Sequence, residues 1–232
     1  MVASRRSVLT ALPALAAARP ARANLEPVDI LLVLAVDVSR SIDEDEAKLQ
    51  REGYRTAITD QRVISAIRSG TLGAIGVVYM EWASADYQRI VIPWTRIDGA
   101  ASAARWADQL AEAPRISMNW TSISGAIEAS LNALNTAPFE GTRRVIDISA
   151  DGVNNSGPPV TLLRDIAVDA GITINGLPIL NDRSPFGRPQ NMSLDVYFQD
   201  FVIGGPGAFM IVAEDFNAFQ GAVLRKLIRE IS

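Results

Sequence analysis

The sequence predicts an α/β fold, a three-layer sandwich whose central sheet is mostly parallel and carries one antiparallel edge strand. Residues 28–36 form an almost unbroken apolar run, which is typical of a strand buried on both faces. Strand and helix patterns alternate after it, and this alternation places helices on both faces of a sheet. The length of 232 residues and the 48% apolar content suffice for one domain with a full core.

The first half of the chain contains one strand, one helix and a hairpin before its later helices. After the first strand, Asp43 and Glu46 form an Asp-x-x-Glu capping pattern that predicts the start of a helix. Two further strands are expected over residues 73–82 and 88–94. Only five residues separate them, too few for a helical crossover, so they should form an antiparallel hairpin at the sheet edge.

The rest of the chain continues the alternation of helices and strands. Further helices are expected over 100–113, 121–134, from Pro158 to the stop at Gly171, over 194–203, and behind the cap Asp215. Further strands are expected over 144–150, 172–180 and 208–213. A polar loop takes residues 181–193, and residues 204–207 form a glycine-rich turn that lacks the Lys-Ser/Thr of a phosphate loop.

The N-terminal segment is expected to be an export signal. A short basic region containing Arg5 and Arg6 precedes an apolar stretch too short to span a bilayer, and residues 21–23 offer a small-x-small cleavage site. The surrounding Ser-Arg-Arg-Ser-Val-Leu resembles a twin-arginine signal, with an ordinary Sec signal as the alternative. We therefore expect residues 1–23 to be removed and residues 24–232 to form one domain in the periplasm.

Export changes the charge of the working protein. Loss of four arginines leaves 18 basic residues against 26 acidic ones, a net charge of −8 instead of the −4 of the whole chain. No later stretch is long and apolar enough for a transmembrane helix. No basic stripe follows the chain either, which argues against nucleic acid as a partner.

Histidine and cysteine are both absent from the sequence. Their absence excludes imidazole and thiol catalysis, disulfides, and zinc sites built from these residues. Any chemistry must therefore come from oxygen ligands, acids, lysine or arginine.

Oxygen-bearing side chains gather where the expected parallel strands end. The first strand ends in Asp37-Val-Ser39-Arg-Ser41, Thr121 opens a later helix, and Asp151 follows a later strand. Ligands of open parallel sheets bind at the carboxyl ends of the strands, so these side chains should share one edge. Three hydroxyls and two carboxylates suit a hard cation such as Mg²⁺, with Mn²⁺ or Ca²⁺ as alternatives. We therefore expect a metal site with one position open to an acidic ligand.

The order Asp-x-Ser-x-Ser, then Thr, then Asp-Gly resembles a von Willebrand factor A domain with a metal-ion-dependent adhesion site. The likeness covers about residues 27–232 and implies a Rossmann-like fold with Asp37, Ser39, Ser41, Thr121 and Asp151 as metal ligands. The stretches 145–155 and 203–209 resemble, within this fold, a bacterial group known as domain of unknown function 1194.

The resemblance implies an exported protein-binding module, not an enzyme, that holds a partner's Asp or Glu carboxylate through the metal. One alternative is a metal-dependent hydrolase or phosphatase. Haloacid-dehalogenase phosphatases also begin from a strand-end Asp, but they need a second Asp where Ser39 stands and a lysine at a strand end. The other alternative is a metal-free structural domain of an envelope assembly.

Several residues near this edge keep two interpretations. Arg40 replaces the glycine that many relatives carry, and it either attracts acidic ligands or is simply solvated. Glu81 is either a second layer around the metal or, as we favour, a surface carboxylate. Asp147 either pairs with an arginine or belongs to a polar network under the metal. Trp120 either lines the ligand surface or packs a loop.

Overall fold

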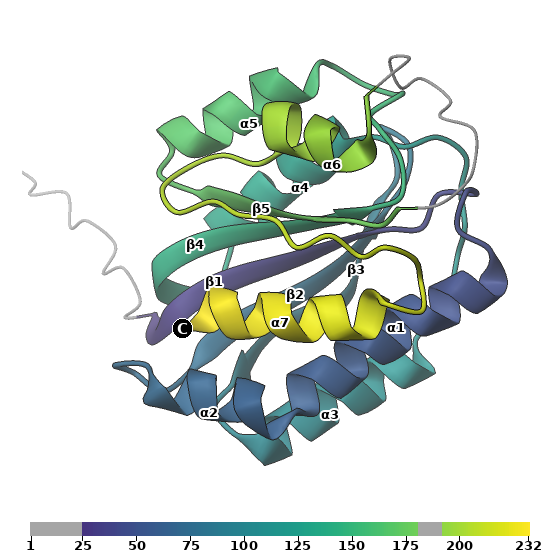
Figure 1. Cartoon of the computed structure of the whole chain (residues 1–232). Coiled ribbons are helices and arrows are strands. Elements are labelled where there is room, and N and C mark those ends of the chain that lie inside the picture. The colour runs from purple at the N-terminus through teal and green to yellow at the C-terminus, as the bar shows by residue number, and fades with distance from the viewer. Residues whose placement is uncertain (1–24, 181–191) are drawn as a thin grey trace, which may run out of the picture.

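The computed structural model describes residues 25–180 and 192–232, which form a five-stranded sheet covered by helices on both faces (Figure 1). The strand order is β3-β2-β1-β4-β5, and all pairings are parallel except that of β2 with β3. The strands are β1 (Glu26–Asp37), β2 (Ile75–Trp82), β3 (Gln88–Ile97), β4 (Phe139–Ala150) and β5 (Thr173–Pro178). The expected fold class, including the antiparallel edge strand, is confirmed.

The central strand β1 organises the sheet because it pairs with β2 on one side and β4 on the other. From Ile30 to Asp37 its side chains are buried almost completely, as the continuous apolar run predicts. In the register of the parallel ladders, Val36 lies opposite both Glu81 and Ser149. β1, β2 and β4 therefore end at the same edge of the sheet.

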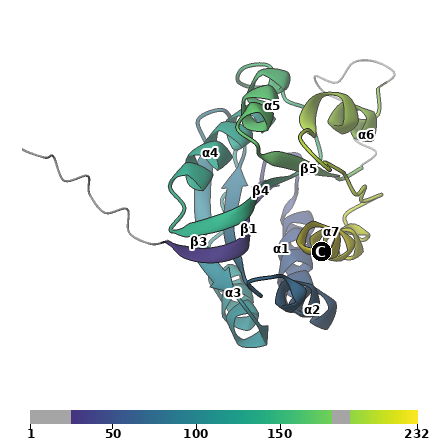
Figure 2. The ribbon, with the colours of Figure 1, turned by 90° about the vertical axis from the view of Figure 1, so that its left-hand side faces the viewer.

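Helices form one layer on each face of the sheet (Figures 1 and 2). One layer contains α1 (Glu44–Thr59), α2 (Gln61–Ser69), α3 (Ala100–Glu112) and α7 (Phe219–Ile231). The other contains α4 (Ile123–Asn135), α5 (Val160–Asp169), α6 (Leu194–Tyr197) and the π-helical turn Phe198–Val202. Two separate apolar cores lie between the sheet and these layers, one on each side.

Local signals explain where α1 begins. Asp43 accepts hydrogen bonds from the backbone N–H groups of Asp45 and Glu46, and Glu46 accepts one from the N–H of Asp43 at 2.8 Å. This is the expected capping box. The break between α1 and α2 was not predicted from the sequence. Asp60 ends α1 and caps α2 by accepting a hydrogen bond from the N–H of Arg62, so a polar cap inside the pattern marks the break.

The strand expected over residues 208–213 is present only as two isolated bridges to β5, at Met210 and Ala213. Ala213 donates to the Pro178 carbonyl at 3.0 Å, and Gly176 donates to the carbonyl of Phe209 at 3.0 Å. Pro178 lies between the two bridged positions, Gly176 and Ile179, and has no N–H to donate, so the ladder is interrupted there. The last helix also begins later than expected, at Phe219, because Asp215 caps the turn that precedes it by accepting from the N–H of Ala218.

A charged cluster lies inside the core between β4, β5 and α7. Lys226 is fully buried and contacts the Asp147 carboxylate at 2.6 Å and the Glu230 carboxylate. Asn175 donates to Glu230 Oε1 at 3.0 Å and accepts from the N–H of Phe209. Asp147 therefore pairs with a lysine, and the expected arginine partner is wrong. Burial raises the pKa of Asp147 to about 7, Lys226 opposes this rise, and Glu230 adds to it.

We expect Asp147 to make stability fall as the pH rises from about 4 to about 7, because across this window the native carboxyl keeps a proton that the unfolded carboxyl has lost. Relative to Asp147→Asn, the wild-type protein should lose on the order of 2–4 kcal/mol of unfolding free energy over that window. Urea unfolding of both proteins at several pH values measures the difference. A difference that stays constant or grows with pH would contradict the assignment.

Candidate functional site

The five residues of the expected site lie at the edge where β1 and β4 end. Asp37 is the last residue of β1, and Asp151 directly follows β4. Ser39 and Ser41 lie in the turn between β1 and α1, and Thr121 lies two residues before α4. All except the half-buried Ser41 are buried.

Four of these residues are joined by a continuous chain of hydrogen bonds. The backbone N–H of Ser39 donates to Asp37 Oδ1 at 2.7 Å, which folds the turn back onto the strand end. The hydroxyls of Ser39 and Ser41 are 2.9 Å apart, and Ser41 donates to Asp151 Oδ1 at 2.7 Å. The two serines therefore point to the same side, toward the two carboxylates, as their alternate spacing predicts.

Thr121 reaches the same edge through the loop that follows Asp151. Its N–H donates to Asn155 Oδ1 at 2.8 Å, and the N–H of Asn155 donates back to the Thr121 carbonyl at 2.8 Å. A Cβ placed on Gly152 would lie 3.6 Å from the Thr121 hydroxyl, so that hydroxyl faces the residue next to Asp151. Asn155 follows Asp151 by four residues, so its bonds join this loop to Thr121. It is a positioning residue for Thr121.

The two carboxylates are electrostatically unfavourable without a cation. Asp37 is completely buried, and its Oδ2 atom has no hydrogen-bond partner among the described residues. Burial raises the pKa of Asp37 well above its ordinary value, the nearby Asp151 raises it further, and the hydrogen bond from Ser39 opposes the rise. A cation bound between the two carboxylates would offset both causes.

The donor set fits a hard divalent cation. It contains three hydroxyls and two carboxylates, and oxygen atoms are the ligands that Mg²⁺, Mn²⁺ and Ca²⁺ prefer. Within residues 25–180 and 192–232, no three Asp, Glu, His or Cys side chains come together as a metal cluster. Any cation at this edge would therefore depend on the hydroxyl groups as well as on Asp37 and Asp151.

Glu81 is not the surface carboxylate that we favoured from the sequence. Its side chain is 1% exposed and forms an ion pair with Arg51 of α1, whose Nη2 lies 2.6 Å from Glu81 Oε1. Arg51 Nη1 also donates to the Ala113 carbonyl, and Nη2 donates to the Pro114 carbonyl at 3.2 Å. The pair therefore fixes the start of the loop that leads from α3 to Thr121.

That loop presents an exposed apolar row beside the site. Ile116, Met118 and Trp120 are each more than 40% exposed, and Met118 bridges Ser39 in the turn that holds the serines. Trp120 has a φ of 68°, a left-handed conformation that is uncommon for a large side chain. Trp120 therefore lies mostly on the surface, 56% exposed, which favours the interpretation that it lines the ligand surface. Arg40 is exposed in the neighbouring turn.

The fold and the arrangement of the site define a von Willebrand factor A-like domain. Residues 27–232 match the family described as Protein of unknown function (DUF1194). The chain belongs to this family, which confirms the resemblance found in the sequence. No curated protein sequence matches the chain.

Solved structures show the same fold at low sequence identity. The pilus adhesin SpaC from Lactobacillus rhamnosus GG, in its open conformation, is 18% identical with a TM-score of 0.59, over 90% of this chain and 31% of its own. The mussel byssus proximal thread matrix protein 1, with a zinc-occupied MIDAS motif, is 13% identical with a TM-score of 0.60, over 88% and 48%. The von Willebrand factor type A protein from Catenulispora acidiphila is 14% identical with a TM-score of 0.58, over 88% and 43%. The chain thus spans less than half the length of these proteins.

An aerotolerance-related membrane protein from Bacteroides fragilis, studied with multiple mutations to serines, has similar length. It is 17% identical with a TM-score of 0.52, over 87% of this chain and 99% of its own. In the described part of this chain, none of the helices combines the length and apolarity that crossing a membrane requires. The expected export signal with Arg5 and Arg6, and Arg183 and Arg188 of the expected polar loop, lie outside the described residues.

We expect Arg51→Met to lower the free energy of unfolding by about 3 kcal/mol or more, because it leaves the Glu81 carboxylate buried without its cation. Glu81→Gln should cost less, since the amide oxygen still accepts from the guanidinium. Lys48→Met is the control, because the ion pairs of Lys48 are exposed to solvent and its loss should change the free energy of unfolding little. Urea unfolding measures all three, and equal losses for Arg51→Met and Lys48→Met would contradict the interpretation.

Proposed function

We propose that this protein is an exported binding module that holds a divalent cation, Mg²⁺ in the first place, at Asp37, Ser39, Ser41, Thr121 and Asp151. The observation that carries the proposal is the buried Asp37 carboxylate. Its Oδ2 atom has no hydrogen-bond partner among the described residues, and its pKa is raised by burial and by Asp151. Two buried carboxylates within an all-oxygen set are stabilised when a hard cation binds between them.

The cation would supply an electrophilic position for a partner. Mg²⁺ takes six oxygen ligands and keeps waters where the protein provides none. A Glu or Asp carboxylate of a partner protein can replace such a water. The exposed side chains of Ile116, Met118 and Trp120 flank this position and would add apolar contact area around the carboxylate.

Binding is favoured over catalysis. The chain contains no histidine or cysteine to act as a base or nucleophile, and the lysine that a phosphatase of the haloacid-dehalogenase type needs is not at this edge. Lys226 is buried with Asp147 and Glu230, and Lys48 is on the exposed side of α1. The adhesin and the matrix protein of similar fold support a binding role by likeness.

Export to the periplasm belongs to the same proposal. Residues 1–23, with the twin arginines Arg5 and Arg6, are the expected signal for the Tat or the Sec route. Protease protection of the protein in spheroplasts, compared with Arg5→Lys/Arg6→Lys, would separate the two routes. Retention of the double variant in the cytoplasm supports the Tat route.

We expect Mg²⁺ or Mn²⁺ to raise the melting temperature of residues 24–232, by roughly 5–10 °C at a hundredfold excess over the dissociation constant. Asp37→Asn should abolish this increase. It should also be more stable than the wild-type protein in EDTA, because it removes a buried negative charge beside Asp151. The control is Asp108→Asn on the exposed side of α3, which should respond to the metal as wild type does. An equal response of all three proteins would exclude the proposed site.

The partner's carboxylate is tested with the immobilised mature domain and a periplasmic extract. We expect a partner to be retained in Mg²⁺, released by EDTA, and not retained by Asp37→Asn. Replacement of the partner's contacting Asp or Glu by Asn or Gln should then abolish binding. Retention that is indifferent to both chelator and Asp37→Asn would favour the metal-free structural domain instead.

A further inference from the structure

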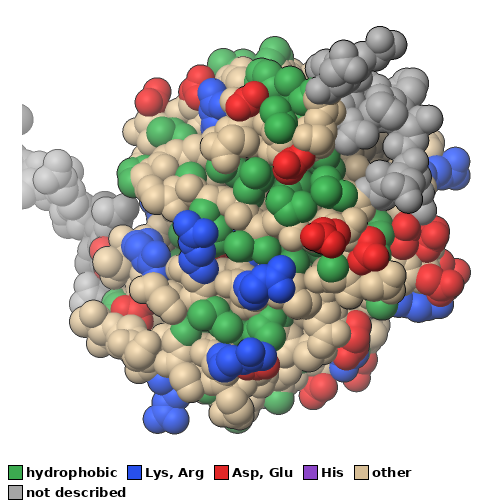
Figure 3. All heavy atoms as spheres, in the orientation of Figure 1, with side chains coloured by type: hydrophobic (Ala, Val, Ile, Leu, Met, Phe, Trp, Pro, Cys, Tyr) green, Lys and Arg blue, Asp and Glu red, His purple; other side chains and the backbone are tan. Residues whose placement is uncertain are grey.

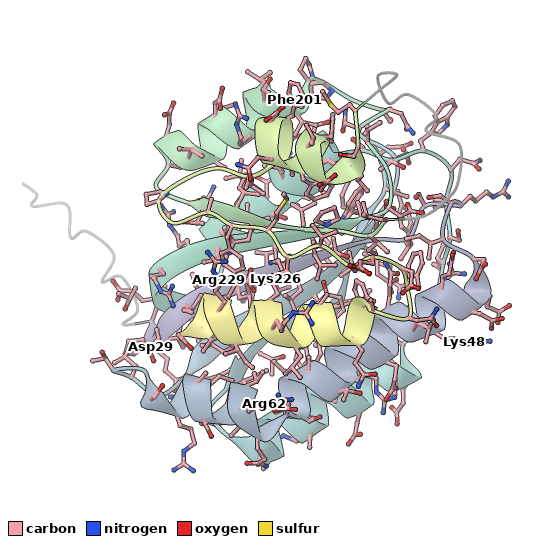
Figure 4. All side chains as sticks on the ribbon, viewed as in Figure 1. Asp29, Lys48, Arg62, Phe201, Lys226 and Arg229 are labelled. Atoms are coloured by element: carbon pink, nitrogen blue, oxygen red, sulfur yellow. The ribbon has the colours of Figure 1, made fainter. Side chains whose placement is uncertain are left out.

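A pocket lies at the opposite end of the sheet from the proposed metal site. It has a volume of about 470 Å³ and lies between the last turn of α7, the middle of β4 and the start of β5. Three arginines line it, Arg143 and Arg144 from β4 and Arg229 from α7. Figure 3 shows basic side chains gathered on this side of the molecule, and Figure 4 places Lys226 and Arg229 on α7 toward the strands.

Each arginine is held in place by a contact that leaves most of its donors available. Arg143 donates from Nη2 to the Glu230 and Ile231 carbonyls, at 2.9 and 3.3 Å. Arg144 donates from Nη2 to the Ala170 carbonyl at the end of α5. Arg229 lies over the ring of Phe209, 4.0 Å from its centroid. A guanidinium carries five N–H donors, so the remaining donors face the pocket or solvent.

These arginines have no carboxylate partner in the part of the chain that the structure describes. Among the described residues, none of the three forms an ion pair. Glu230 is the one acidic residue that lines the pocket, and its carboxylate is already bound by Lys226 and Asn175. The C-terminal ends of α5 and α7 each contribute about half a negative charge. Three guanidinium groups outweigh this, so the pocket stays positive.

Like charges that are brought together without a counterion repel one another, and here they gather in a protein whose net charge is −4. Hydrogen bonds to the carbonyls at the ends of α7 and α5 give a structural role to the Nη2 groups of Arg143 and Arg144. They account neither for the third guanidinium nor for the remaining donors. An oxyanion accepts several such donors at once, because guanidinium groups match carboxylate and phosphate oxygens in pairs.

We propose that this pocket binds a small organic or inorganic oxyanion that carries two or more negative charges on carboxylate or phosphate groups. Arg143 and Arg144 from β4 and Arg229 from α7 all line it and would supply the guanidinium donors. Thr142 also lines the pocket and would contribute a hydroxyl. The volume is within the range of small-molecule pockets. The site is independent of the metal site, and its occupant would bind with or without a divalent cation.

The test is isothermal titration of the mature protein, depleted of divalent cations on a chelating resin, with inorganic phosphate and with citrate. Sodium chloride at the same ionic strength gives the baseline. We expect saturable binding of at least one of the two anions, and the tighter one identifies the phosphate or the carboxylate as the preferred group. Absence of heat from both anions at millimolar concentration would overturn the proposal.

Variants separate a built site from general attraction to positive charge. Arg229→Gln and Arg144→Gln should each weaken the affinity for the anion by about tenfold or more, as expected for the loss of a charge-assisted hydrogen-bonded pair. Arg225→Gln removes the same charge from an exposed position on α7 outside the pocket and should leave affinity unchanged. Arg229→Lys keeps the charge and should lie between the two. Equal weakening by Arg225→Gln and Arg229→Gln would overturn the proposal.

Discussion

The side-by-side parallel pairing of β1 and β4 is the constraint on which the rest of this structure depends. It requires both strands to end at one edge, and both are followed or closed by an aspartate, Asp37 and Asp151. Their carboxylates are therefore brought together in a largely buried position, where the charged form is unfavourable and the pKa of Asp37 is raised. The two serine hydroxyls contact each other beside these carboxylates, and Ser41 donates to Asp151.

Other buried carboxylates of the core are paired with cationic side chains. Glu81 is paired with Arg51, and Lys226 is shared by Asp147 and Glu230, so these buried carboxylates each have a cationic partner within the chain. Asp37 is the exception, because no cationic side chain of the described residues contacts it. A buried carboxylate without a cationic partner among the described residues, beside three hydroxyls, is what separates the proposed binding site from structural ion pairs.

Local sequence patterns were sufficient to predict the sheet and to place the five expected ligands at one of its edges. The apolar run of β1, the short hairpin and the Asp43 cap each depend on neighbours in sequence, and all three are present. The alternate spacing of Ser39 and Ser41 likewise predicts that their hydroxyls meet. By contrast, the partners of Glu81 and Asp147 come from helices far away in the chain. No spacing rule indicates that α1 places Arg51 over β2 or that α7 carries its lysine inward. The broken ladder at Pro178 shows a second kind of failure, in which one missing donor outweighs an apolar pattern.

The central claim concerns a cation between Asp37 and Asp151, and anomalous diffraction from crystals soaked in Mn²⁺ tests it most directly. The account predicts one strong peak at the edge of the sheet, within bonding distance of the Ser39 and Ser41 hydroxyls and absent from crystals of Asp37→Asn. A peak elsewhere on the molecule, or no peak at this edge in crystals of the wild-type protein, would contradict it.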